Sequence, residues 1–378
     1  MCRVLLWIMV FCLSVGILPA TCLAEDINPD SLTIEEAVNL ALSNSKELEK
    51  ASLEVDAAKV TRDEAWDAHN AVLMQTYIPG QDMYLSVPTG QELDGLVYTT
   101  NFAWLAKKKE YEAKVDSVVL SVHQKYCNVL TAREKVESQR LAVQRDEEKL
   151  RIAKLRYQLG LNTVSDVSRA KMQVADSQAK LETAEKELEQ RYIELAEYLG
   201  LPEDSRPTLV DEIEYASLEV ENVDNQIDSI ASNSPSVWVA EEAVRLEKQT
   251  YGKINSYDLD KVELDKAEVG VDITKKNIRE ITRNIYYAIK QLEDSYTAAL
   301  EAVQAAEEAL RVAQLMFDVG MATEADVLNA EAALASARYA LNNLVCQHEL
   351  LKMAFEKPWT YGALLNSGSS SSSSSSYS

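Results

Sequence analysis

Apolar residues recur at helical spacing along most of the chain, with polar residues that favour helices between them. Leucines follow this spacing in two stretches: Leu141, Leu150, Leu155, Leu159, and Leu181, Leu188, Leu195, Leu199. No proline lies between Pro88 and Pro202, or between Pro235 and Pro358. Most of the remaining residues in these stretches are Ala, Glu, Lys and Gln, which are good helix formers. The pattern predicts very long helices. One over Trp104–Gln158 would be about 80 Å long and would need coiled-coil-like packing to be stable.

One segment of this pattern occurs twice. Residues 150–175 and 310–335 align at a fixed offset of 160, and ten of the 26 aligned positions are identical. Gly160 and Gly320 are equivalent in this alignment, and glycine readily adopts the left-handed conformation that ends a helix. Each copy therefore predicts a helical hairpin that turns at its glycine. A duplication on this scale predicts two tandem repeats of one structural unit.

Polar residues after each glycine predict where the next helix begins. Thr163 and Thr323 lie three residues after the glycines, and Asp166 and Asp326 lie three residues further on. This is the spacing of a capping box, in which a carboxylate also complements the helix N-terminus. The shared Gly-x-x-Thr-x-x-Asp pattern is thus first a folding device.

A second internal similarity aligns Ser43-Asn44-Ser45 with Ser232-Asn233-Ser234, at an offset of 189. The first half therefore contains about 29 residues that the second half lacks, between Ser45 and Trp104. The non-helical stretch Val72–Phe102 lies there and predicts one β-hairpin or short meander. Its β-favouring runs are Val72–Ile78, Met83–Val87 and Leu96–Phe102. The matching stretch of the second half, Tyr251–Glu263, predicts little or no hairpin.

The first 24 residues are predicted to be a secretory signal peptide. Arg3 precedes the apolar run Val4–Leu18, which is too short to span a bilayer comfortably. Cys22-Leu23-Ala24 then offers a small residue for cleavage. A retained N-terminal anchor is the alternative.

The predicted layout after the signal peptide has four parts. Residues 25–201 form the first repeat, with the β insertion at about 72–102, and residues 202–224 form a linker. Residues 225–359 form the second repeat, which is helical with its hairpin absent or reduced. Residues 360–378 form a serine-rich tail that cannot bury a core and is predicted to be disordered. The fold class is mainly α, with long antiparallel helices that form an α-helical barrel on oligomerisation.

Composition excludes several functions. Without residues 1–24 the chain has 37 basic and 61 acidic residues, a net charge of −24, which would repel nucleic acid. Only Cys127 and Cys346 then remain, at non-equivalent repeat positions, and they do not imply a disulfide framework. The three histidines are scattered, and no phosphate loop, metal-ligand spacing or nucleophile motif is present. We expect no enzyme activity and no cofactor.

The chain resembles the TolC-like outer-membrane efflux family over about Leu32–Trp359. The markers are LTIEEAVNLALSNSKELEKASLEVDAAK near the N-terminus, and the paired tips RYQLGLNTVSDV and MFDVGMATEADV. The resemblance implies a homotrimer whose helices form a tunnel across the periplasm, capped by a β-barrel in the outer membrane. It implies a passive export duct of a multipartite efflux or type I secretion system. A periplasmic adaptor and an inner-membrane transporter would be its partners.

The resemblance also assigns roles to the two tips. The adaptor-docking turns would be Tyr157–Val167 in the first copy and Phe317–Val327 in the second. Their site residues would be Tyr157, Gly160, Leu161, Thr163 and Asp166, and Phe317, Gly320, Met321 and Thr323. Family members carry acidic rings at the tunnel entrance after the second tip. Asp326 matches that pattern, while Asn329 replaces its second acid. Two interpretations of Asp326 stay open, a tunnel-entrance ring and a helix cap alone.

The chain departs from the family in its β segments. Family protomers each give two hairpins to the membrane barrel, whereas one is predicted here. Membrane contact through about 72–102 is therefore open. Three explanations remain: strands within Tyr251–Glu263, a larger oligomer, or a homologue without a conventional barrel. The alternative function is a non-conducting, secreted coiled-coil protein with a structural or adaptor-like role in the envelope.

Overall fold

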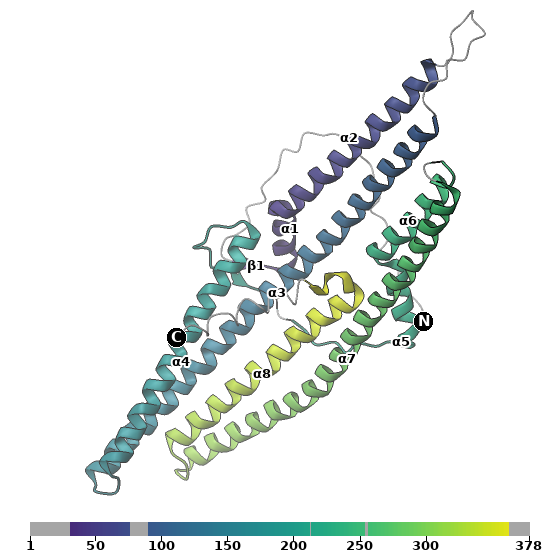
Figure 1. Ribbon diagram of the computed structural model, residues 1–378. Helices are drawn as coiled ribbons and strands as arrows, with labels where there is room; N and C mark the ends of the chain where they lie inside the picture. The colour runs from purple at the N-terminus through teal and green to yellow at the C-terminus, as the bar shows by residue number, and fades with distance from the viewer. Residues whose placement is uncertain (1–30, 76–89, 212, 254–255, 363–378) are drawn as a thin grey trace, which may run out of the picture.

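The computed structural model describes residues 31–75, 90–211, 213–253 and 256–362, which form two matching sets of helices (Figure 1). The first set is α1 (Ile34–Asn44), α2 (Lys46–Gln75), α3 (Gly90–Gln158) and α4 (Val164–Leu199). The second set is α5 (Val223–Asn233), α6 (Pro235–Thr250), α7 (Tyr257–Asp318) and α8 (Glu324–Glu356), followed by the 3-10 turn η1 (Pro358–Thr360). The mainly α fold is confirmed. The two tandem repeats are confirmed as well, because the order of helices α1 to α4 recurs in α5 to α8. The predicted signal peptide lies outside the described residues.

The two longest helices, α3 and α7, contain 69 and 62 residues. At the usual rise per residue these lengths are about 100 and 90 Å. Each long helix packs against a shorter partner at both ends: α3 against α2 and α4, and α7 against α6 and α8. Figure 1 shows the two hairpin turns, between α3 and α4 and between α7 and α8, at the same end of the molecule.

The strand predicted at Leu96–Phe102 is wrong, because this segment lies within α3. Val97 and Thr100, one helical turn apart, are both buried, and α3 packs on α2 here through a 2.8 Å hydrogen bond between Asp94 and His69. The Thr100 hydroxyl donates to the Leu96 carbonyl within the helix. Helix packing thus overrides the β preference of these residues. Val72–Gln75 is also helical, at the end of α2, while Met83–Val87 lies outside the described residues.

The repeated Ser-Asn-Ser sequence coincides with a break between two helices in each repeat. Ser45 separates α1 from α2, and Ser234 separates α5 from α6. In both cases the serine hydroxyl accepts a hydrogen bond from the backbone N–H three residues later, at 3.3 Å. Serine at this position caps the second helix, so the chain can bend without leaving buried donors unsatisfied.

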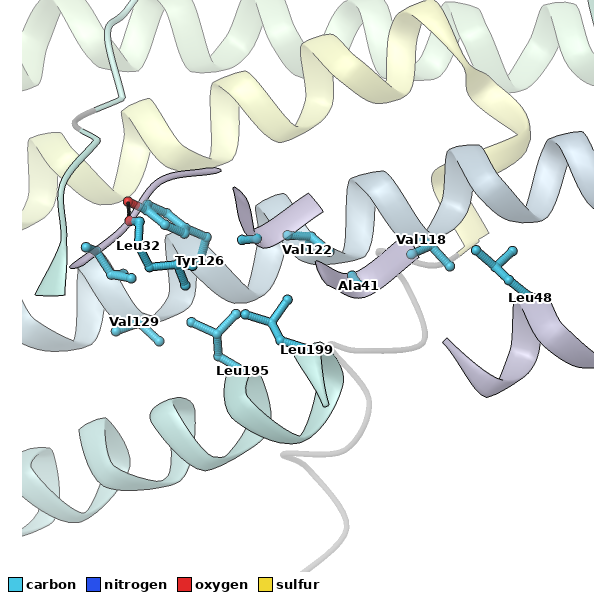
Figure 2. Close-up of a cluster of buried hydrophobic side chains, with 11 residues drawn as sticks. Leu32, Ala41, Leu48, Val118, Val122, Tyr126, Val129, Leu195 and Leu199 are labelled. Carbon is cyan, nitrogen blue, oxygen red and sulfur yellow. Dashed lines mark hydrogen bonds between the residues drawn. The ribbon is translucent and has the colours of Figure 1, made fainter. Parts of the chain in front are cut away.

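Two buried clusters meet on opposite faces of α3. The first contains Val122, Tyr126 and residues of β1, α1 and α4 (Figure 2). The second contains Leu120, Cys127 and residues of α5, α7 and α8. Because α3 contributes to both clusters, the two repeats share one structural core.

The described part of the segment between the repeats returns to the N-terminal end of the first repeat. Its strand β2 (Thr208–Leu209) pairs in parallel with β1 (Ser31–Leu32). The buried Tyr126 hydroxyl donates to the Leu32 carbonyl and accepts from the Asp211 N–H, at 3.2 and 3.1 Å. Burial raises the pKa of Tyr126, which keeps its hydroxyl proton available for this bridge. The sequence did not predict this strand pair.

The far end of this segment is fixed to the second repeat. The Tyr215 ring stacks on Tyr296 of α7 at 3.6 Å. The Leu218 N–H donates to Glu293 Oε1 at 2.8 Å, and Lys290 donates to the Leu218 carbonyl at 2.9 Å. The predicted linker is therefore a strap that touches both repeats.

The C-terminal end of the described chain packs on α3. Trp359 Nε1 and Lys357 Nζ both donate to Asp116, at 3.0 and 2.6 Å. Thr360 is buried and Tyr361 packs against the second cluster. The boundary predicted for the disordered tail, at residue 360, lies too early because these residues are part of the core. The rest of the predicted tail, from residue 363, lies outside the described residues.

Candidate docking site at the helical tips

The two hairpin turns repeat the same backbone arrangement. Gly160 and Gly320 have φ angles of 74° and 76°. In the first turn, the Leu161 N–H donates to the Arg156 carbonyl at 2.8 Å, and the Gly160 N–H donates to the Tyr157 carbonyl at 2.9 Å. The equivalent atoms of the second turn are joined at 2.8 and 2.9 Å. This is the Schellman arrangement, and it confirms the predicted glycine turns.

The start of the returning helix is capped in the same way at both tips. The Thr163 N–H and hydroxyl donate to Asp166 Oδ2 at 2.9 and 2.8 Å, and the equivalent Thr323 groups donate to Asp326 at 2.8 and 2.7 Å. The Thr N–H, and then the Thr hydroxyl, lower the pKa of each aspartate. The predicted capping pairs are confirmed at both tips, so each turn is rigid and charged at neutral pH.

Apolar side chains surround both turns and are exposed. Leu161 and Leu159 are each 73% exposed, and Met321 is 80% exposed. Other exposed apolar residues at the tips are Tyr157, Val164, Phe317 and Val319. Leu159, Val164 and Val319 lie within the predicted tip turns, although they were not among the residues singled out there. Their signal in the sequence was apolar character next to a glycine turn, where polar residues are usual.

The two tips differ in charge although their backbones match. Residues 149–171 contain six basic residues and one acidic residue, whereas the equivalent residues 309–331 contain one basic and four acidic residues. The difference arises at equivalent positions such as Arg169 and Asn329, or Lys171 and Glu331. The first tip is therefore basic and the second acidic, which gives each a different preference for a charged surface.

The two hairpins approach each other near their tips. Arg151 of α3 lies 4.0 Å from Glu324 of α8. Both side chains are more than half exposed, and a pair of this kind contributes little to stability. It does place the basic and acidic tips beside each other on one end of the protomer.

Asp326 and Asn329 lie one turn apart on α8. Asp326 is exposed and accepts both hydrogen bonds from Thr323, while Asn329 is half-buried. The structure therefore establishes the capping role of Asp326.

The described residues offer little support for other kinds of site. They contain no group of three or more His, Cys, Asp or Glu side chains arranged to hold a metal ion. None of the helices in the described ranges combines the length and apolar character needed to cross a bilayer. A pocket of about 160 Å³ lies between α3, α8 and the strap.

Solved structures share this architecture. A membrane protein of Pseudomonas aeruginosa superposes with a TM-score of 0.61 at 14% sequence identity. The superposition covers 86% of this chain and 93% of the Pseudomonas chain. The CmeC outer membrane channel of Campylobacter jejuni superposes with a TM-score of 0.60 at 14% sequence identity, over 87% of this chain and 85% of CmeC. The outer membrane protein VceC of Vibrio cholerae superposes with a TM-score of 0.56 at 17% sequence identity, over 88% of this chain and 95% of VceC. At these identities the likeness establishes the fold.

Curated protein sequences show no match to this chain. The sequence profile of the outer membrane efflux proteins, in contrast, matches residues 82–201 and 216–348, which are about two thirds of the chain. The chain belongs to the outer membrane efflux protein family. The profile covers both hairpins and omits the first half of the strap, in agreement with the two structural repeats.

As an outer membrane efflux protein, the chain is a duct component of an efflux system. It is located at the outer membrane with a periplasmic helical portion. The long helix pairs, which are much longer than those of a globular domain, are the part suited to cross the periplasm. The family consists of ducts, and no catalytic constellation was predicted from the sequence.

Proposed function

We propose that three copies of this chain form a passive export duct whose helical tips dock with a periplasmic adaptor. Family proteins form trimeric channels that work with adaptors and inner-membrane transporters. The observation that carries the proposal is the exposed apolar rim on two rigid turns, with Leu161 at 73% and Met321 at 80% exposure. Exposed apolar groups on a preorganised scaffold lose little entropy when a partner covers them.

The tip charges support two distinct contacts with the adaptor. The basic first tip favours an acidic surface and the acidic second tip a basic one, so the adaptor must match the tips in order around the ring. A trimer would present six tips that alternate in sign. This alternation sets the register of docking, while the apolar rim supplies most of the affinity.

The docking proposal is tested with two substitutions at the rim, Leu161→Asp and Met321→Asp. Both side chains are exposed, so we expect unchanged thermal unfolding. Pull-down of the purified adaptor of the same organism should fall at least about tenfold, which corresponds to about 1.4 kcal/mol. Leu53→Asp is a matched control, because Leu53 is 61% exposed on α2. Wild-type binding by both tip variants would contradict the proposal.

Glycine substitution tests the turn itself. Gly160→Val and Gly320→Val place a β-branched residue at a positive φ angle, which is strained whatever the surroundings. We expect a distorted turn and weaker adaptor docking. Pull-down at wild-type level by both variants would show that the turn geometry is not part of the docking site.

We propose further that Asp326, with Asn329 one turn away, lines the tunnel entrance of the trimer. Three aspartates in one ring would attract cations. Asp326→Asn should lower cation selectivity, measured as the reversal potential across a planar bilayer in a KCl gradient. Asp166→Asn is the matched control, because Asp166 has the same capping bonds at the other tip. Equal effects of both variants would leave only the capping role.

Conductance tests the duct as a whole. We expect purified trimers reconstituted in liposomes to conduct ions. Intact trimers that conduct under no condition would support the alternative, a non-conducting coiled-coil protein that spaces the layers of the envelope.

A further inference from the structure

Two cysteines from different repeats meet in the core. Cys127 lies on α3 and Cys346 on α8, and both belong to the second buried cluster. They are 3% and 6% exposed. Each thiol lies close enough to the other to be the largest influence on its pKa. Their positions do not correspond in the repeat alignment, and for this reason the sequence did not predict the pair.

We propose that Cys127 and Cys346 form a disulfide that joins the two repeats of the exported protein. The structure records both as free thiols. The periplasm is an oxidising compartment in which adjacent thiols are converted to disulfides. Apart from the proximity of the two cysteines, the proposal depends only on the location of the helices in the periplasm. It does not depend on adaptor docking or on conduction.

The surroundings of the pair give one thiol a route to solvent. Cys346 lines the pocket of about 160 Å³, together with Arg133, Asn342 and Ile213. Cys127 is not among the residues that line it. An exchange reagent can therefore reach Cys346 first.

The pocket also assigns the two roles in the reaction. The thiolate is the nucleophile in thiol–disulfide exchange. Cys346, the thiol that lines the pocket, is therefore the attacking group, and the enclosed Cys127 is the group that resolves the intermediate.

The oxidation balances as thiol–disulfide exchange with a disulfide donor, either an oxidised dithiol protein of the envelope or a small disulfide such as oxidised glutathione. The Cys346 thiolate attacks one donor sulfur, forming a mixed disulfide and releasing the other donor sulfur as a thiolate. Cys127, losing its proton, then attacks the Cys346 sulfur and displaces the remaining donor sulfur. The cysteines lose two electrons and two protons in total, and the donor is reduced to the dithiol form.

Peptide mapping tests the proposal on the full chain exported to the envelope. The protein is denatured in N-ethylmaleimide without reductant and digested with trypsin. Cys127 then lies in Tyr126–Arg133 and Cys346 in Tyr339–Lys352, each the sole cysteine of its peptide. We expect one linked species, lighter than the sum of the two peptides by two hydrogen atoms. Prior reduction with dithiothreitol should replace it with two alkylated peptides.

Two results would overturn the proposal. One is recovery of both peptides alkylated without reductant. The other is a linked species accompanied by a cross-linked dimer on a non-reducing gel, which would place the bond between protomers. Cys127→Ser is the control, in which Cys346 should be alkylated in full.

A stability measurement distinguishes a bond that constrains the fold from an incidental one. Dithiothreitol should lower the thermal midpoint of the wild type by about 5–10 °C, because the bond closes a very long loop. The Cys127→Ser, Cys346→Ser double variant should show no such response. An equal response of both proteins would count against the bond. If the variants do not fold, the peptide map of the wild type still decides.

Discussion

Glycines with positive φ angles serve different purposes in this chain, and their surroundings tell them apart. At Gly160 and Gly320 a side chain would enter open space, so only the backbone conformation requires glycine there. At Gly200, after α4, a Cβ atom would lie 3.0 Å from Asn44 Cβ. Asn44 Nδ2 also donates to the Leu199 carbonyl at 2.8 Å. Gly200 is therefore required both by its conformation and by the close approach of α1.

Alanine substitutions should separate these two requirements. We expect Gly160→Ala to lower the free energy of unfolding by about 1 kcal/mol through backbone strain. Gly200→Ala should lower it by about 2–3 kcal/mol, because it adds a clash and disturbs the Asn44 hydrogen bond. Urea unfolding followed by circular dichroism measures both values.

The control for these substitutions is Gly270→Ala. Gly270 lies inside α7 without a positive φ angle, and a methyl group added there would meet only open space. Alanine should therefore stabilise the helix by about 1 kcal/mol. Equal losses at Gly160 and Gly200 would show that Asn44 contributes nothing to the requirement for glycine.

At the scale of elements, one carboxylate, that of Glu293, helps to hold the strap to the second repeat. Burial opposes the charge on Glu293, but hydrogen bonds from Lys290 and the Leu218 N–H outweigh it and lower the pKa of Glu293. Tyr215 and His348 pack beside this group, with His348 Nε2 at 3.5 Å from Glu293 Oε1. The strap is thus fixed by a charged acceptor between α7 and α8.

A pH dependence follows from the lowered pKa. A carboxylate of this kind stabilises the fold above its ordinary pKa, and the contribution is lost as pH falls through the folded value. We expect Glu293→Gln to cost about 2 kcal/mol at pH 7 and to match the wild type well below pH ~4. Unfolding curves at several pH values measure this.

Glu308→Gln is the control for the strap. Glu308 pairs with Arg311 on the surface of α7, where an ion pair contributes little. If Glu293→Gln cost no more than this control at pH 7, the strap would not depend on its carboxylate.

Local signals explain which elements could be predicted from the sequence. The hairpin turns at Gly160 and Gly320 were predictable because the turn, the cap and the charge all lie within seven residues. Leu96–Phe102 was misassigned because its helical state depends on packing against α2. The β1–β2 pair and the contact between Cys127 and Cys346 join distant residues, so no local pattern indicates them.

For the molecule as a whole, the central fact is that α3 belongs to both buried clusters. Val122 and Leu120 are two residues apart on this helix, and they face different clusters. Both are buried, at 0% and 1% exposure. The two repeats should consequently unfold together, although they are copies of one unit.

Leu120→Ala tests this coupling. We expect a loss of about 3 kcal/mol with a single transition, seen at the same midpoint by helical circular dichroism and by tryptophan fluorescence. Leu53→Ala is the control and should change stability by less than about 0.5 kcal/mol, because Leu53 is exposed. Two separate transitions, with only one shifted by Leu120→Ala, would show that the repeats are independent.

The shared helix α3 also implies an order in which the parts of the protein fold. Each hairpin joins neighbours in sequence, as α3 does with α4, and such local pairs form quickly. Contact between α3 and α8 joins residues as far apart as Cys127 and Cys346, so it must wait for nearly the whole chain. As the chain emerges N-terminus first, a finished first repeat exposes Leu120 and Cys127 until α8 arrives. We expect the newly exported chain to present this apolar surface to solvent during that interval, until the second repeat packs on it.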